Sequence, residues 1–161
     1  MPVRTVTKDP KALTLTVVAE FPVPVERVWA AWGDPRQLER FWGPPTWPAT
    51  FVEHNFVVGG NASYYMTGPD GTKSRGWWRF LQMDVPRSFE LEDGFADETG
   101  KPTTKLPSTR MRVSFAAIDG GTRMTMVSTF PSLQAMEQLT AMGMEEGLKA
   151  ALGQMDGVLG V

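Results

Sequence analysis

Residues 110–130, RMRVSFAAIDGGTRMTMVSTF, carry the clearest structural signal in this sequence. Apolar and polar side chains alternate on both sides of Asp119-Gly120-Gly121, which is a strong turn signal. We therefore expect an antiparallel hairpin with one buried face and one face in water. The residues expected on the buried face are Met111, Val113, Phe115, Ala117, Met124, Met126, Ser128 and Phe130.

The segment that follows this hairpin has helical periodicity. Ser132 is a suitable N-cap residue, and apolar residues follow it at roughly helical spacing to the end of the chain. Glycines interrupt the pattern at four positions, Gly143, Gly147, Gly153 and Gly157. Because interior glycine costs a helix roughly 0.5–1 kcal/mol relative to alanine, we expect one long helix that is kinked or closely packed on the sheet at these positions.

The N-terminal part predicts a strand followed by two short helices. Residues 13–21 alternate between apolar and polar side chains, as a half-buried strand does. The period then changes, because residues 25–32 place apolar side chains at i, i+3, i+4 and i+7. A second short helix is expected around residues 38–41, after the break at Gly33-Asp34-Pro35.

Residues 47–130 predict strands joined by turns. Alternate apolar side chains in residues 62–66 share one face, and Gly68-Pro69-Asp70-Gly71 is a strong hairpin turn. The return strand, residues 74–83, is apolar on both parities, so alternation does not assign its faces. Residues 96–109 form a polar stretch, which we interpret as a mobile loop.

Taken together, these elements predict an α+β fold. The length of 161 residues fits one domain, residues 1–161, with one sizeable core. A curved antiparallel sheet would wrap around the long C-terminal helix, with the two short helices after the first strand. We expect an apolar cavity between the helix and the concave face of the sheet.

Composition excludes several classes of protein. The chain has no cysteine, which excludes disulfides, thiolate nucleophiles and cysteine-based metal sites. The net charge is −2 without a basic block, so we expect no nucleic-acid partner. The first ten residues lack the apolar core of a secretory signal, and no apolar run reaches the length of a membrane span. These features predict a cytoplasmic protein.

Several phrases resemble a known family. They occur in the same order over nearly the whole chain: residues 21–29 (FPVPVERVW), 34–35 with 41–44 (DP and FWGP), 58–60 (VGG), 68–71 (GPDG), 121–125 (GTRMT) and 143–147 (GMEEG). The chain resembles the START-like (SRPBCC) helix-grip superfamily and, within it, bacterial proteins related to the activator of heat-shock protein 90 ATPase (Aha-like). The resemblance implies a helix-grip fold that binds an apolar molecule, on which some members catalyse reactions.

The sequence departs from the family pattern at two places. Residues 61–63 are small where the family often has a bulky aromatic or basic residue, and Leu148 stands where tryptophan is common. We expect both differences to enlarge the cavity.

Polar candidates for chemistry are few. His54 is the one histidine, and we interpret it as structural or as a surface residue. Glu145 and Glu146 are adjacent, so at most one can face the cavity, and a solvated helix face is the simpler interpretation. The sequence therefore assigns no catalytic residue, no metal site and no cofactor.

The methionines are more suggestive, because seven of the ten fall on stripes predicted to face inward, and methionine adapts readily to irregular spaces. Core filling is the competing interpretation. The predicted ligand-binding residues are Tyr64, Met66, Trp78, Phe95, Met111, Phe115, Met126, Met144 and Leu148.

We therefore predict a binding protein for a small hydrophobic or amphipathic molecule. One alternative is a cyclase- or hydrolase-type enzyme that uses the same cavity, for which two titratable groups facing inward would be the discriminating observation. Another is a module that binds a heat-shock protein 90-type chaperone, which a closed, dry core would favour. A homodimer is also considered, with Trp47 and Trp77 as the candidate exposed aromatics.

Overall fold

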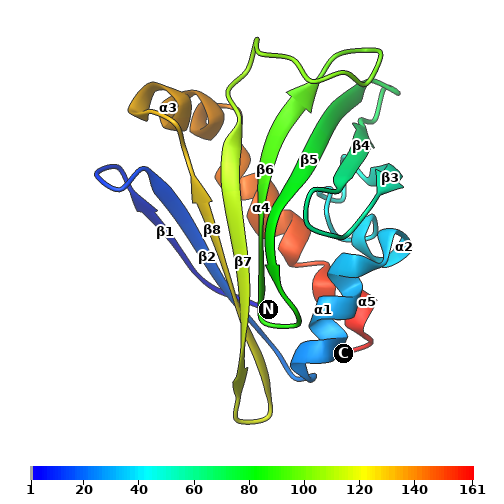
Figure 1. Ribbon diagram of the computed structural model, residues 1–161, viewed down its shortest axis with the longest axis vertical. Coiled ribbons are helices and arrows are strands. Elements are labelled where there is room, and N and C mark those ends of the chain that lie inside the picture. Colours follow the sequence, from blue (N-terminus) through cyan, green and yellow to red (C-terminus); the bar gives the residue numbers. More distant parts are fainter. Residues whose placement is uncertain (1) are drawn as a thin grey trace.

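The computed structural model describes residues 2–161 as one curved antiparallel sheet packed against helices (Figure 1). The sheet order is β1-β2-β8-β7-β6-β5-β4-β3. Its strands are β1 (Val3–Asp9), β2 (Thr14–Phe21), β3 (Ala49–His54), β4 (Asn61–Thr67), β5 (Lys73–Asp84), β6 (Ser88–Ala96), β7 (Thr109–Ile118) and β8 (Gly121–Thr129). The α+β helix-grip architecture predicted from the sequence is confirmed.

Two helices follow β2, namely α1 (Val25–Gly33) and α2 (Pro35–Leu38). The C-terminal segment forms α3 (Leu133–Ala141), α4 (Met144–Leu152) and α5 (Met155–Leu159), which is three consecutive helices and not the one continuous helix expected. The first break occurs because Gly143 has φ +89°, a left-handed conformation that ends α3 and begins α4. Ser132 caps α3 as predicted, since its hydroxyl accepts from the amide N–H of Ala135 at 3.0 Å.

The hairpin of β7 and β8 has the predicted faces with one exception. Met111, Val113 and Phe115 are buried, whereas Ala117 is exposed. Ala117 pairs with Thr122 next to the turn, where the hairpin extends beyond the helices (Figure 1). The expectation that Ala117 lies on the buried face is therefore wrong, because no helix covers that end of the hairpin.

Two strands, β1 and β5, could not be described from the sequence pattern alone. The sequence pattern did not predict β1, because this edge strand exposes most of its side chains. In β5 the structure assigns the faces: Trp78 and Phe80 are buried in the core, whereas Trp77 is half-buried on the other face. The indole N–H of Trp77 donates to the carbonyl oxygen of Phe95 at 3.0 Å.

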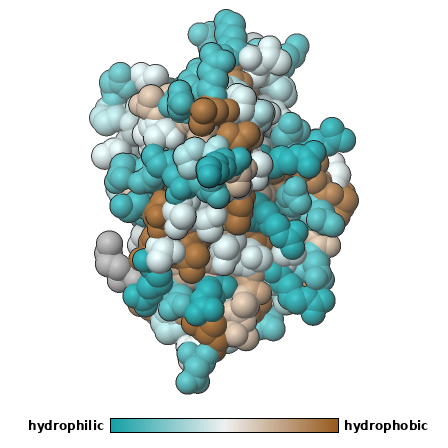
Figure 2. Space-filling model, turned by 90° about the vertical axis from the view of Figure 1, so that its left-hand side faces the viewer, coloured by the Kyte–Doolittle hydropathy of each residue, from teal (hydrophilic) through white to brown (hydrophobic). Residues whose placement is uncertain are grey.

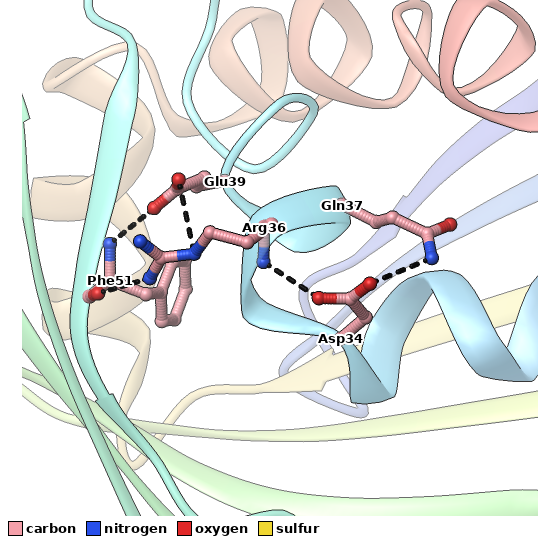
Figure 3. A network of polar contacts seen from close by, with 5 residues as sticks. All are labelled: Asp34, Arg36, Gln37, Glu39 and Phe51. Carbon is pink, nitrogen blue, oxygen red and sulfur yellow. Dashed lines mark hydrogen bonds and ion pairs between the residues drawn. The ribbon is translucent and has the colours of Figure 1, made fainter.

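A polar network attaches α2 to the sheet (Figure 3). The Asp34 carboxylate accepts from the amide N–H of Arg36 at 3.0 Å and from the side chain of Gln37 at 2.9 Å. The guanidinium of Arg36 donates to the carbonyl oxygen of Phe51 at 2.9 Å, and the amide N–H of Phe51 donates to Glu39 at 3.0 Å. The hydrogen bond from Gln37 is the main cause that lowers the pKa of Asp34. This network fixes where the chain enters β3.

The core lies between the concave face of the sheet and the helices. Beneath α1, the fully buried ring of Trp32 packs edge-on against Phe41 and Phe89, with centroid distances of 5.1 and 5.3 Å. Beneath α3, a smaller cluster contains Leu15, Phe130, Met136 and Leu139. Within residues 2–161, no helix is both long and apolar enough to cross a membrane.

Candidate functional site

A cavity of about 380 Å³ lies between the sheet and the C-terminal helices. Its floor comes from β4 to β8, its roof from α3, α4 and the Met142-Gly143 link, and one wall from residues 42–47. This volume lies within the range of small-molecule sites, which is roughly 300–1,000 Å³. The cavity is partly open to solvent and adjoins a surface groove beside residues 97–106, with which it shares Ser74, Arg75 and Phe95.

The structure places the nine predicted site residues in two groups. Six of them line the cavity: Tyr64, Met66, Phe95, Met111, Met144 and Leu148. Trp78, Phe115 and Met126 face the same side of the sheet but lie in the packed core outside the cavity lining. Trp78 packs against Trp42 at 4.9 Å between ring centroids, and Phe115 packs against Trp29 at 5.9 Å.

The acidic residue of the cavity lining was not predicted from the sequence. Asp93 lies on β6 with the same parity as Leu91 and Phe95, so its carboxyl group projects from the concave face into the cavity. This parity is visible in the sequence and could have indicated Asp93. The neighbouring Glu90 and Glu92 lie on the opposite face, where Glu90 forms an ion pair with Arg110 at 3.8 Å.

Asp93 is the centre of a small polar group within the apolar cavity. The Tyr64 hydroxyl donates to Oδ1 of Asp93 at 3.4 Å, a long hydrogen bond. The indoles of Trp42 and Trp78 pack around Tyr64 with ring centroids 6.5 and 5.7 Å away. Both indole N–H groups are buried and have no hydrogen-bond partner within residues 2–161. We call Asp93, Tyr64, Trp42 and Trp78 the polar centre.

Burial changes the protonation of the polar centre. It raises the pKa of Asp93 to about 7, against the opposing effect of the hydrogen bond from Tyr64. Asp93 keeps part of its surface open to the cavity, but the surrounding protein removes enough water to disfavour the ionised form. Burial also raises the pKa of Tyr64 well above its usual value, with the Asp93 charge as a second cause. Near neutral pH, the Tyr64 hydroxyl therefore stays protonated and can donate a hydrogen bond, while Asp93 titrates between its neutral and ionised forms.

The other polar candidates lie away from the cavity. Nε2 of His54 is 2.9 Å from the carbonyl oxygen of Trp32, and burial lowers the pKa of His54, which fits the first of the two roles, structural or surface, that we predict for it. Glu145 forms an ion pair with Lys8 at 3.7 Å. Glu146 is exposed and forms one with Lys149 at 3.8 Å, so neither glutamate lines the cavity.

The candidate exposed aromatics are both half-buried. Trp47 contributes to the cavity wall, and Gly68 provides the space for its ring, because a Cβ at that position would lie 2.6 Å from the indole. Trp77 packs over Gly94 in the same way, with 2.5 Å from a Cβ to its ring. These residues therefore have structural roles and do not provide an exposed aromatic surface.

A curved antiparallel sheet closed by C-terminal helices over an internal cavity defines a helix-grip protein, a class that includes binding proteins and enzymes alike. Comparison with known families narrows this class. The chain belongs to the family described as Activator of Hsp90 ATPase homolog 1-like protein, whose model matches residues 22–160. This match confirms the resemblance found in the sequence.

Solved structures show the same architecture. A protein from Arthrobacter aurescens is 55% identical with a TM-score of 0.93, and the alignment covers 97% of this chain and 91% of that chain. A Mycobacterium smegmatis protein is 48% identical with a TM-score of 0.91, covering 98% and 97%. A Staphylococcus epidermidis protein is 28% identical with a TM-score of 0.84, covering 98% and 94%. A comparison with curated proteins found no match.

Proposed function

We propose that this protein binds a small hydrophobic or amphipathic molecule in the cavity between the C-terminal helices and the sheet. The observation that carries the proposal is the unfilled volume of about 380 Å³ beneath α4, lined mainly by apolar side chains around a single carboxyl group. An apolar site with a few polar groups that fix orientation is the usual form of a small-molecule site.

The lining is suited to ligands of varied shape. Met66, Met111, Met142 and Met144 contribute unbranched, polarisable side chains from opposite walls. Leu148 faces the same space. A larger residue there would occupy volume that we assign to the ligand.

An enzymatic reaction in the same cavity is a second candidate. Two titratable groups facing inward were the observation required for it, and Asp93 with Tyr64 is such a pair. A carboxyl with a pKa of about 7 suits a general acid or base near neutral pH, and the Tyr64 hydroxyl could donate to a developing negative charge. Catalysis would require Asp93 to exchange a proton with the bound molecule.

The partner hypotheses have less support. A closed, dry core would have favoured a chaperone-binding module, but the space beneath α4 is not closed. The face on the side of β1 and α3 carries small, separate hydrophobic areas among hydrophilic residues (Figure 2). Chaperone binding and a homodimer therefore remain predictions that need their own experiments.

Fluorescence titration with Prodan, an uncharged solvatochromic naphthalene probe, tests the binding proposal. We expect a blue-shifted emission with the wild-type protein and an affinity about tenfold lower in Leu148→Trp, a loss of about 1.4 kcal/mol, because the indole would fill part of the cavity volume that the probe needs. Leu133→Trp is the matched control, since Leu133 is exposed on α3 outside the cavity lining. Equal binding by Leu148→Trp and wild type would place the probe elsewhere and contradict the proposal.

A further inference from the structure

We propose that Asp93 is the recognition group of the cavity, and that it selects amphipathic ligands carrying a basic nitrogen over ligands carrying an acidic group. This inference rests on the proposed function, because it requires that the cavity holds a ligand. It adds the chemical class of that ligand.

The position of Asp93 allows it to meet a ligand directly. Its neighbours in the sheet register are Trp78 on β5 and Thr109 on β7, so it lies on an inner strand of the sheet and not on an edge strand. A carboxylate can accept about four hydrogen bonds, whereas Asp93 receives one long bond, from Tyr64. Most of its accepting capacity is therefore unused by the protein, and Asp93 lines the cavity.

The part of the chain that the structure describes supplies no counter-charge to Asp93. Within residues 2–161, Asp93 forms no ion pair, and burial together with the Tyr64 hydrogen bond accounts for its altered pKa. Arg75 is the one cationic residue of the lining, and it has the parity of Trp77, which is on the opposite face of β5. Its guanidinium lies over the Tyr65 ring, 5.3 Å from the centroid.

The other walls of the cavity are uncharged. The lining residues from α3 and α4 are Leu139, Met144, Gly147 and Leu148, and those from β7 and β8 are Thr109, Met111 and Ser128. The surface groove beside residues 97–106 carries charges of both signs, namely Lys73, Arg75 and Lys105 beside Asp97 and Glu98. Inside the cavity, the sign of the charge is therefore determined by Asp93.

An ionised carboxylate in apolar surroundings needs a partner. Without a bound cation, a proton neutralises Asp93 near neutral pH. A ligand ammonium would neutralise it with a charge-assisted hydrogen bond, while a ligand carboxylate or phosphate would be repelled. The aromatic side chains of Trp42 and Tyr64 in the same wall add electron-rich faces that favour a cation. The apolar body of the ligand would then lie against the methionines and Leu148.

Isothermal titration calorimetry with three probes of matched shape tests this inference. The probes are 4-phenylbutylamine, 4-phenylbutan-1-ol and 4-phenylbutyrate, each compared at pH 8 and pH 5.5. At pH 8 we expect the amine to bind about tenfold tighter than the alcohol, and the carboxylate to bind most weakly. At pH 5.5 this preference should shrink, because Asp93 is then protonated.

Two variants locate the preference. Asp93→Asn should lower the affinity for the amine to that for the alcohol. Glu92→Gln should leave the amine affinity unchanged, because this substitution removes the same charge from the opposite face of β6, outside the cavity lining. The wild-type comparison of the three probes tests the inference even if Asp93→Asn folds poorly.

The outcomes separate this inference from the proposed function. Binding of all three probes without an amine preference, or a preference that persists in Asp93→Asn, would overturn the role of Asp93 while leaving the cavity as a binding site. Failure of all three probes to bind would overturn both proposals.

Discussion

Replacing Asp93 with asparagine should stabilise the ligand-free protein much more at pH 8 than at pH 5. Asparagine has nearly the same shape and can still accept the hydrogen bond from Tyr64, but it has no charge to bury. In the folded wild type, burial raises the pKa of Asp93 from 3.8 to about 7. Asparagine does not titrate, so the variant removes this difference in pKa between the folded and unfolded states.

The sign follows from proton binding. Between pH 4 and pH 7 the unfolded chain has released the Asp93 proton while the folded protein still holds it, so the free energy of unfolding falls as the pH rises through this window. A shift of about three pKa units corresponds to about 4 kcal/mol when the carboxyl is ionised in both states, and roughly 2–3 kcal/mol of this develops between pH 5 and pH 8. We expect the lower end, because Asp93 keeps part of its surface open to the cavity.

Urea denaturation of wild type, Asp93→Asn and Glu92→Gln at both pH values measures this effect. The advantage of Asp93→Asn over wild type should grow by about 2 kcal/mol from pH 5 to pH 8, and that of Glu92→Gln should stay within about 0.5 kcal/mol. If Asp93→Asn raised the free energy of unfolding by the same amount at both pH values, the argument that ionisation of the buried Asp93 destabilises the folded protein would be refuted.

Three further predictions concern the fold and the polar centre. Thr122→Val should lower the free energy of unfolding by about 1–2 kcal/mol in urea, because the buried hydroxyl donates at 2.7 Å to a backbone carbonyl two residues before α1; an unchanged midpoint would contradict this. Gly143→Ala should lower the free energy of unfolding by about 1–2 kcal/mol, because residue 143 has a left-handed φ. Gly147→Ala should leave this free energy unchanged or raise it, because Gly147 lies in the interior of α4 and a Cβ added there would have no atom within 4 Å. Equal melting temperatures of the two variants would disprove this difference. Tyr64→Phe should raise the pKa of Asp93 further in an NMR titration, since the lost hydrogen bond favours the ionised form, and a lowered pKa would be inconsistent with that role.

Much of the fold could be predicted because local patterns agree with the tertiary structure. The alternation around Val113 and Met126 places both in the core, and these two residues face each other in the observed register. The edge strand β1 was missed because a strand covered by few neighbours shows little apolar alternation. The break at Gly143 was only partly predicted, since a glycine in a helical pattern does not by itself specify a positive φ.

The candidate site was less predictable than the fold. Parity assigns Met111 and Met126 to the same face, but only the path of the helices decides that Met111 borders the cavity while Met126 lies in the packed core. Asp93 was not predicted because a pattern of alternating apolar residues, such as Leu91 and Phe95, does not indicate an acidic residue between them on the same face of β6. The residue that gives the site its chemical character is therefore the one that departs from the pattern.

Native mass spectrometry of the protein purified from its own host, followed by denaturation to release any bound molecule, tests the central claim most directly. We predict a complex with one small molecule in the wild type, and a reduced amount of it in Leu148→Trp prepared in the same way. A wild-type protein that carries no small molecule and also fails to bind Prodan would contradict the claim that the cavity beneath α4 is a ligand site.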